Sequence, residues 1–243
     1  MESTKTEVKP YSAEGSKREQ VEKMFDSISH KYDFLNHFLS MGIDHVWRRK
    51  AIARLKDIQP KKVLDVATGT ADLAIAALKL NPDEVVGIDL SENMLGVGRT
   101  KLKKKGFDNI TLMQGDSEDL PFEDNHFDAI TVGFGVRNYE NLERGLNEMK
   151  RVLRPGGKLV VLEFSKPSAF PIKQFFTFYS KYILPLWGKL FSGSQEAYVY
   201  LPESVKHFPE GQHFIDILSK CGYQNTSFSR LTFGITSVYE GTK

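Results

Sequence analysis

A glycine and an acid twenty residues apart are the side chains whose types and spacing most directly suggest ligand binding. Gly69 lies in the small-residue segment Ala67-Thr68-Gly69-Thr70-Ala71, and Asp89 ends the next apolar run. A glycine turn lets the backbone approach a ligand closely, and an acid at this separation can accept hydrogen bonds from a ribose diol. Because NAD and S-adenosylmethionine both carry such a ribose, the pair predicts a nucleoside ligand without deciding between them.

The residues around Gly69 favour S-adenosylmethionine. A dinucleotide needs Gly-x-Gly-x-x-Gly for its pyrophosphate, and the available registers read Ala67, Gly69, Asp72 or Gly69, Ala71, Ala74. Asp72 would place a carboxylate against the pyrophosphate, whereas S-adenosylmethionine has no phosphate and carries a sulfonium and an ammonium. We therefore expect Gly69 and Thr70 to approach the methionine part and Asp89 to hold the ribose. Taken alone, the loop also fits a plain strand-to-helix turn.

A second acidic segment, Gln114-Gly115-Asp116-Ser117, follows the third expected strand. Asp116 is placed to accept a hydrogen bond from the adenine amino group, and the Ser117 backbone can pair with the ring edge. The ordered set of Gly69, Asp89 and Asp116 supports one nucleoside site better than any member does alone.

The elements that must position these residues alternate between strands and helices. The expected strands cover 61–66, 84–89, 109–113, 127–132, 158–163, 222–230 and 231–239. The helices among them are expected at 72–80, 91–105, 139–153 and 209–221. This alternation predicts an α/β fold with a Rossmann-like, mostly parallel seven-stranded sheet. Since the last two strands are joined tightly, the last one should be antiparallel.

We expect one α/β domain over 17–243, preceded by a disordered leader at 1–16. A length of 243 residues suits one sizeable α/β domain. Helices are expected within 17–58, and an aromatic, mostly helical insertion at 166–203 interrupts the sheet pattern. That insertion either lines an apolar pocket or packs as a helical lid.

Composition excludes several classes of protein. The formal net charge is only +2, which gives no general attraction for nucleic acid, and the single Cys221 excludes an internal disulfide and a thiolate metal site. The six histidines show no metal-ligand spacing, so no metal is expected. Without a signal peptide or a spanning segment, the expected location is the cytoplasm, peripherally at the inner face of the membrane.

The segments over 61–164, read in order, resemble the class I S-adenosylmethionine methyltransferases. A closer resemblance, over nearly the whole chain, is to the quinone C-methyltransferases of menaquinone and ubiquinone biosynthesis. It is carried by Tyr32-Asp33-Phe34-Leu35-Asn36, Ser40, Trp47, Phe134-Gly135-Val136-Arg137-Asn138, 151–165 and Tyr239-Glu240-Gly241. The family usually has His three residues before the tryptophan, and this chain has Asp44 there.

This resemblance implies methylation of a demethylmenaquinol ring carbon, and in some bacteria of a ubiquinone precursor. Arg137 is expected to be the main electrostatic residue, because it could stabilise a quinolate or hold a water that takes the proton. Asn138 is expected to position the acceptor. The alternative for Arg137 is a buried side chain that ties its loop to a carboxylate such as Glu163.

The implied partner is a prenylated quinol, which calls for transient membrane-surface contact through 170–191 or the N-terminal helices. Neither a nucleic-acid partner nor a particular oligomeric state is indicated. The alternatives are a methyltransferase for another lipid or small molecule, a NAD-dependent oxidoreductase and a non-catalytic S-adenosylmethionine binder. An RNA methyltransferase is disfavoured by the weak net charge.

Overall fold

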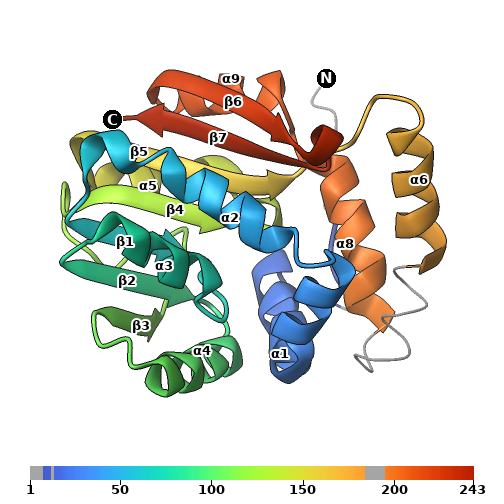
Figure 1. The fold of residues 1–243 in the computed structure, drawn as a ribbon, viewed down its shortest axis with the longest axis horizontal. Helices are drawn as coiled ribbons and strands as arrows, with labels where there is room; N and C mark the ends of the chain where they lie inside the picture. The colour runs from blue at the N-terminus through green and yellow to red at the C-terminus, as the bar shows by residue number, and fades with distance from the viewer. Residues whose placement is uncertain (1–7, 12–13, 184–194) are drawn as a thin grey trace.

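A seven-stranded mixed sheet forms the centre of the computed structural model, which describes residues 8–11, 14–183 and 195–243 (Figure 1). The strand order is β3-β2-β1-β4-β5-β7-β6. The strands are β1 (Lys62–Val66), β2 (Glu84–Asp89), β3 (Ile110–Gln114), β4 (Phe127–Gly133), β5 (Leu153–Phe164), β6 (Gln224–Leu231) and β7 (Thr236–Thr242). The first five are parallel to one another, and β7 runs antiparallel to β5 and to β6. The predicted fold class is confirmed.

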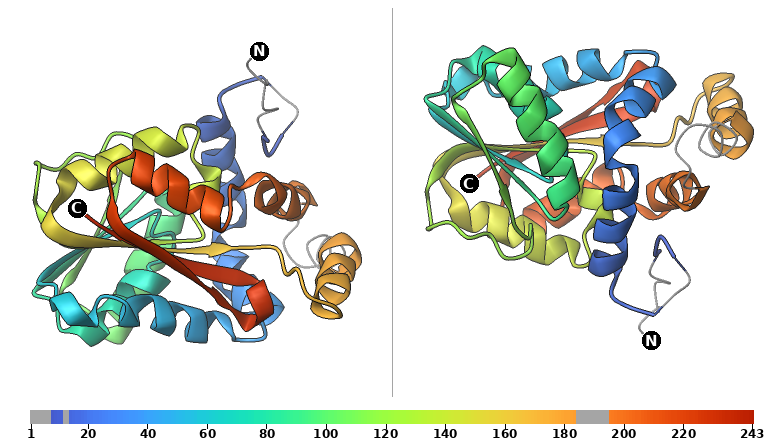
Figure 2. Two further views of the ribbon diagram at one scale, coloured as in Figure 1. Left: turned by 90° about the horizontal axis from the view of Figure 1, so that it is seen from above. Right: turned by 90° about the horizontal axis from the view of Figure 1, so that it is seen from below.

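Two helical layers cover the sheet, as the edge-on views of Figure 2 show. The helices are α1 (Lys17–Leu39), α2 (Asp44–Ala53), α3 (Asp72–Ala77), α4 (Glu92–Lys105), α5 (Leu142–Val152), α6 (Ile172–Phe178), α8 (Gln195–His207) and α9 (Gln212–Lys220). Helices α2, α3 and α4 pack on one face, and α5 and α9 pack on the other.

Burial on both faces explains why the central strands are apolar at successive positions. In β1, Val63 packs in the cluster beneath α2 and α3, whereas Leu64 packs in the cluster beneath α5 and α9. In β4, Ala129 and Ile130 divide between the same two clusters. A strand buried on both faces reads as a continuous apolar run, because alternate side chains point to opposite faces.

Helices α1 and α8 lie beyond the carboxyl ends of the parallel strands, away from the two layers (Figures 1 and 2). Val21, Met24 and Ile28 of α1 pack against Ala197 and Tyr200 of α8 in a small apolar cluster separate from both sides of the sheet. This is the edge at which open parallel sheets bind ligands.

Several boundaries differ from those predicted. Within the helical region expected at 17–58, residues 17–39 form one continuous helix. Strand β5 begins at Leu153 instead of residue 158, and residues 154–157 are an irregularity inside that strand. The last strand starts at Thr236, because Thr232, Phe233 and Gly234 adopt positive φ and form the connection. Most of the predicted leader and residues 184–194 of the predicted insertion lie outside the described residues.

Candidate active site

The loop after β1 is held in place by a buried acid of the strand itself. Asp65 accepts hydrogen bonds from the hydroxyls of Thr68 and Thr131, each at 2.6 Å. Burial raises the pKa of Asp65 to about 6, and the two hydroxyls oppose this shift. The sequence prediction omits Asp65, although an acid inside an apolar strand is itself a signal of a buried, hydrogen-bonded role.

Gly69 and Asp89 are joined directly. The Gly69 N–H donates to Asp89 Oδ2 at 2.8 Å, and the Ser91 N–H donates to Asp89 Oδ1 at 3.0 Å. Gly69 has φ +56°, and a Cβ there would stand 3.2 Å from Met94 Cε. Burial raises the pKa of Asp89 to about 6, the nearby Asp26 carboxylate adds to the rise, and the two N–H groups oppose it. A carboxylate thus stands at the end of β2, beside the glycine loop.

Asp116 and Ser117 follow β3 at the same edge of the sheet. Asp116 Oδ1 accepts from the Glu118 N–H at 2.9 Å, and Asp116 Oδ2 forms an ion pair with Arg18 of α1 at 2.8 Å. Ser117 is buried. The order of the strands therefore brings Gly69, Asp89 and Asp116, from three successive loops, to one place.

These loops surround a cavity with about 720 Å³ of empty space, part of it open to solvent. The volume suits a nucleoside-sized ligand. Five carboxylate side chains and one guanidinium line it: Glu22, Asp89, Asp116, Glu118 and Glu140 against Arg18. Such a cavity attracts a cation and repels a pyrophosphate, so its charge favours S-adenosylmethionine over NAD.

Of the predicted site residues, Gly69, Asp89, Asp116, Ser117 and Asn138 line this cavity, and Thr70 and Arg137 lie behind its wall. The buried Thr70 hydroxyl donates to Asp33 of α1 and accepts from Lys101 Nζ at 3.2 Å. Asp72 also lies outside the cavity, in ion pairs with Lys101 at 2.7 Å and Arg48 at 3.2 Å. The individual roles assigned to the predicted residues stay predictions.

Arg137 forms a buried ion pair. Its Nη1 is 2.7 Å from Glu163 Oε1, with exposed side-chain fractions of 7% for Arg137 and 0% for Glu163. The guanidinium also donates to the Phe134 carbonyl and to Ser204 Oγ. Burial raises the pKa of Glu163, and the charge of Arg137 opposes the rise. The pair therefore ties the loop after β4 to the end of β5.

Asn138 and Tyr139 bring unpartnered polar atoms to the cavity wall. Both residues line the cavity, and both are buried. Among the described residues, neither Asn138 Oδ1 nor the Tyr139 hydroxyl has a hydrogen-bond partner, although Ser117 lies close enough to the phenol to favour its ionised form. Burial is the largest influence on this phenol and raises its pKa far above the usual value, so Tyr139 is neutral. Sequence reasoning did not assign a role to Tyr139.

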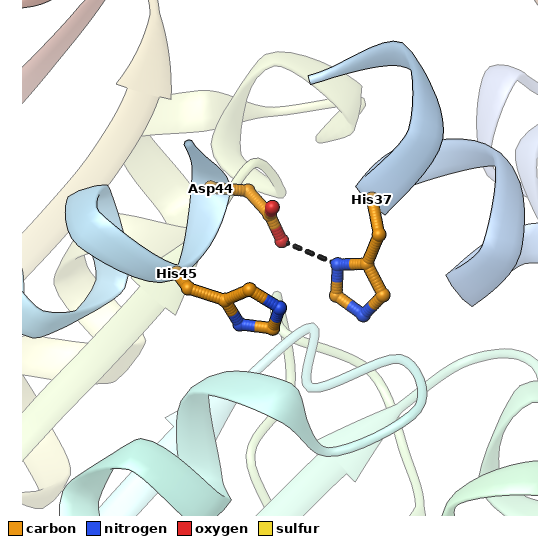
Figure 3. Close-up of side chains that lie close together, drawn as sticks. All are labelled: His37, Asp44 and His45. Carbon is orange, nitrogen blue, oxygen red and sulfur yellow. Dashed lines mark hydrogen bonds and ion pairs between the residues drawn. The ribbon is translucent and has the colours of Figure 1, made fainter. Parts of the chain in front are cut away.

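Figure 3 shows a cluster of His37, Asp44 and His45 at the junction of α1 and α2. Ligand atoms of the three lie within 4.8 Å of one another, which raises the question of a metal site. However, Asp44 already binds Arg48, His37 Nδ1 at 2.7 Å and Ser40 Oγ at 2.8 Å. The imidazole rings stack at 4.5 Å with planes 26° apart, so they do not converge on one point. Although burial acts to raise the pKa of Asp44, the Ser40 hydrogen bond and the Arg48 charge lower it, as in a structural ion pair.

Comparison with known proteins points to methyltransferases, in agreement with a cavity whose charge favours S-adenosylmethionine. Residues 13–243 match the model of the ubiE/COQ5 methyltransferase family. A demethylmenaquinone methyltransferase of Bacteroides fragilis is 52% identical over 97% of both chains. The ubiquinone/menaquinone biosynthesis C-methyltransferase UbiE of Geotalea daltonii is 43% identical over 93% of this chain and 97% of its own. A solved S-adenosylmethionine-dependent methyltransferase of Thermotoga maritima, 18% identical, shares the fold with a TM-score of 0.64, over 91% of this chain and 99% of its own.

Proposed function

The chain belongs to the ubiE/COQ5 methyltransferase family, and we propose that it transfers the methyl group of S-adenosylmethionine to a ring carbon of demethylmenaquinol, giving menaquinol. The observation that carries the proposal is the match to demethylmenaquinone methyltransferases over almost the whole chain. The acidic cavity supports it independently, because a sulfonium donor is a cation.

The residues that line the cavity fit the donor in the predicted order. Asp89 would accept hydrogen bonds from the ribose hydroxyls, Asp116 and Ser117 would hold adenine, and the Gly69 loop would approach the methionine part. Thr70 would act from behind the wall by holding that loop on α1. The bound donor supplies a carbon already activated by its sulfonium, so the protein mainly aligns the two reactants.

The acceptor carbon becomes a good nucleophile when the neighbouring quinol hydroxyl loses its proton. A phenol has a pKa of about 10, so the site must favour the quinolate. Arg137 is too basic to act as a proton acceptor, and we propose that it stabilises the negative charge. Asn138, which lines the cavity, would position the acceptor oxygen.

The decisive experiment is turnover with labelled S-adenosylmethionine and a reduced, short-chain demethylmenaquinone. We expect label in the quinone ring, and the Asp89→Ala variant should lose it because donor binding fails. Label transferred to an ethanolamine lipid but not to the quinol would contradict the proposed acceptor. A reduced ubiquinone precursor in a parallel reaction tests the second acceptor, since ubiquinone biosynthesis is part of the name of the Geotalea relative.

We further propose that α6 docks on a membrane surface, since the acceptor is a lipid. Among the described residues, no helix is long and apolar enough to cross a bilayer. Yet Phe170, Phe175, Phe178 and Tyr182, in and around α6, leave 54–81% of their surface exposed. Exposed aromatic side chains on and next to one short helix suit the interface between lipid and water.

Vesicle co-sedimentation with the double variant Phe175→Ser/Phe178→Ser tests this surface. The wild type should bind vesicles that contain anionic lipid, and the double variant should lose most of that binding. The matched control is Gln174→Ser, a change at a neighbouring exposed position of the same helix. Equal binding by all three proteins would contradict docking through α6.

A further inference from the structure

Helix α1 forms polar contacts with each of the four loops that make up the cofactor cavity. Lys17 Nζ donates to the Tyr139 carbonyl at 2.7 Å, after β4, and Arg18 pairs with Asp116, after β3. About two turns further along, the helix contacts the loop after β2, and about two turns beyond that it contacts the loop after β1. Asp26 accepts from Ser91 Oγ at 2.5 Å, and Asp33 accepts from Thr70 Oγ1 and pairs with Lys101 at 2.6 Å.

The same helix is a wall of the cavity. Arg18, Val21, Glu22, Phe25 and Tyr32 of α1 line it opposite Gly69, Asp89 and Asp116. A ligand held by those loops would therefore lie between them and α1. With α1 in this position, the helix covers one side of the partly open cavity, and its movement away from the loops would widen the opening through which the ligand exchanges.

The contacts that hold α1 on the loops are of a kind that can open. They are hydrogen bonds and ion pairs in which the Arg18 side chain is 51% exposed and Asp33 is 26% exposed. The buried apolar residues of α1 cluster with α8, outside the two clusters that hold the sheet layers together, and the helix also runs along α4. Partly exposed ion pairs are weak compared with core packing, so α1 can leave the loops without unfolding the sheet.

We propose that α1 is a gate of the cofactor site. It closes over S-adenosylmethionine, and it opens to release S-adenosylhomocysteine and to admit the next S-adenosylmethionine. The ion pair and hydrogen bond at Asp33 act as one latch, and Asp26 with Ser91 acts as another. The gate depends on the shared cofactor and not on the acceptor that the protein methylates. Its test needs no quinol, and it can fail or succeed separately from the proposed reaction.

The test is the binding kinetics of S-adenosylhomocysteine, measured by stopped-flow mixing with tryptophan fluorescence. Asp33 does not line the cavity, so Asp33→Ala removes a latch without removing a ligand contact. In a gated site both entry and exit wait for opening. We therefore expect the association and the dissociation rate constants to rise together, each by about tenfold or more for the loss of one charge-assisted hydrogen bond.

A second variant and a control complete the design. Lys101→Met breaks the same ion pair from α4 and serves if Asp33→Ala folds poorly, and it should raise both rate constants as well. Ser27→Ala is the matched control, since the hydroxyl of the exposed Ser27 donates to the Met24 carbonyl of its own helix and has no other hydrogen bond within the described part of the chain. Hydrogen exchange of α1 amides should slow when S-adenosylhomocysteine binds. A rise in the dissociation rate alone, or no change in either rate, would overturn the gate.

Discussion

Replacing Arg137 by glutamine should reveal how much of the loop after β4 depends on one buried ion pair. Glu163 is completely buried, and Arg137 is the charged partner at 2.7 Å. Breaking a buried pair costs about 3–5 kcal/mol, because it leaves an uncompensated charge. Glu163 keeps the hydrogen bond from the Phe164 N–H at 2.8 Å, so we take the lower end, about 3 kcal/mol. For a chain of this length that is about 6–12 °C in melting temperature.

The loss of stability in Arg137→Gln should depend on pH. Burial already raises the pKa of Glu163, and removal of the Arg137 charge raises it further. A carboxyl whose pKa is raised in the folded state stabilises the fold below its unfolded pKa, about 4.3, and that stability is lost as pH rises through the folded pKa. The melting temperature of Arg137→Gln should therefore fall further below that of the wild type at pH 8 than at pH 5.

Calorimetry of Arg137→Gln, Glu163→Gln and the double variant, together with turnover, separates the two roles of Arg137. The double variant should recover most of the melting temperature, because no charge is left unpaired. If Arg137 acts on the acceptor, turnover stays reduced by about a hundredfold in the double variant, as for the loss of an oxyanion donor. A deficit for Arg137→Gln of less than about 1 kcal/mol at pH 8 would refute the ion-pair reasoning.

Three further predictions concern the cavity. Asp89→Ala should weaken S-adenosylmethionine binding at least tenfold by calorimetry, since a charge-assisted hydrogen bond is worth about 1.5–3 kcal/mol; unchanged affinity would remove Asp89 from the site. Wild-type affinity should fall as pH drops below about 6, because protonation of Asp89, whose pKa burial raises to about 6, removes a negative charge from a site for a cation. A titration that is flat between pH 5 and pH 8 would contradict this. Tyr139→Phe should leave the free protein as stable or more stable by about 1 kcal/mol, because the buried hydroxyl has no partner among the described residues; a clear loss of melting temperature would mean that it has one.

The sequence was sufficient for those parts of the site that depend on strand order. Gly69, Asp89 and Asp116 each follow a strand of a parallel sheet, and the carboxyl ends of such strands meet at one edge. Their convergence therefore needs only the alternation of strands and helices. The spacing of Gly69 and Asp89 also predicted their proximity, which takes the form of a hydrogen bond.

Side-chain contacts between segments far apart in the sequence could not be predicted from the order of the strands. The hydroxyl of Thr70 points to Asp33, thirty-seven residues earlier, and no periodicity encodes that pairing. The ion pair of Arg137 with Glu163 likewise joins side chains twenty-six residues apart, and the sequence alone left this contact as one of two alternatives. The path of α1 over the cavity follows from its contacts with α4 and α8, which are again long-range contacts.

The long reach of α1 also bears on how the protein is made. Lys17 can form its hydrogen bond to the Tyr139 carbonyl only after Tyr139, 122 residues later in the chain, has been synthesised. At a synthesis rate of about 5–20 residues per second, that delay is about 6–24 s. Throughout this interval the apolar side of α1 lacks α8, whose residues follow Tyr139 in the chain. Helix α1 thus reaches its native place only after much later segments have been synthesised, and its apolar side is a surface that a chaperone can bind in the meantime.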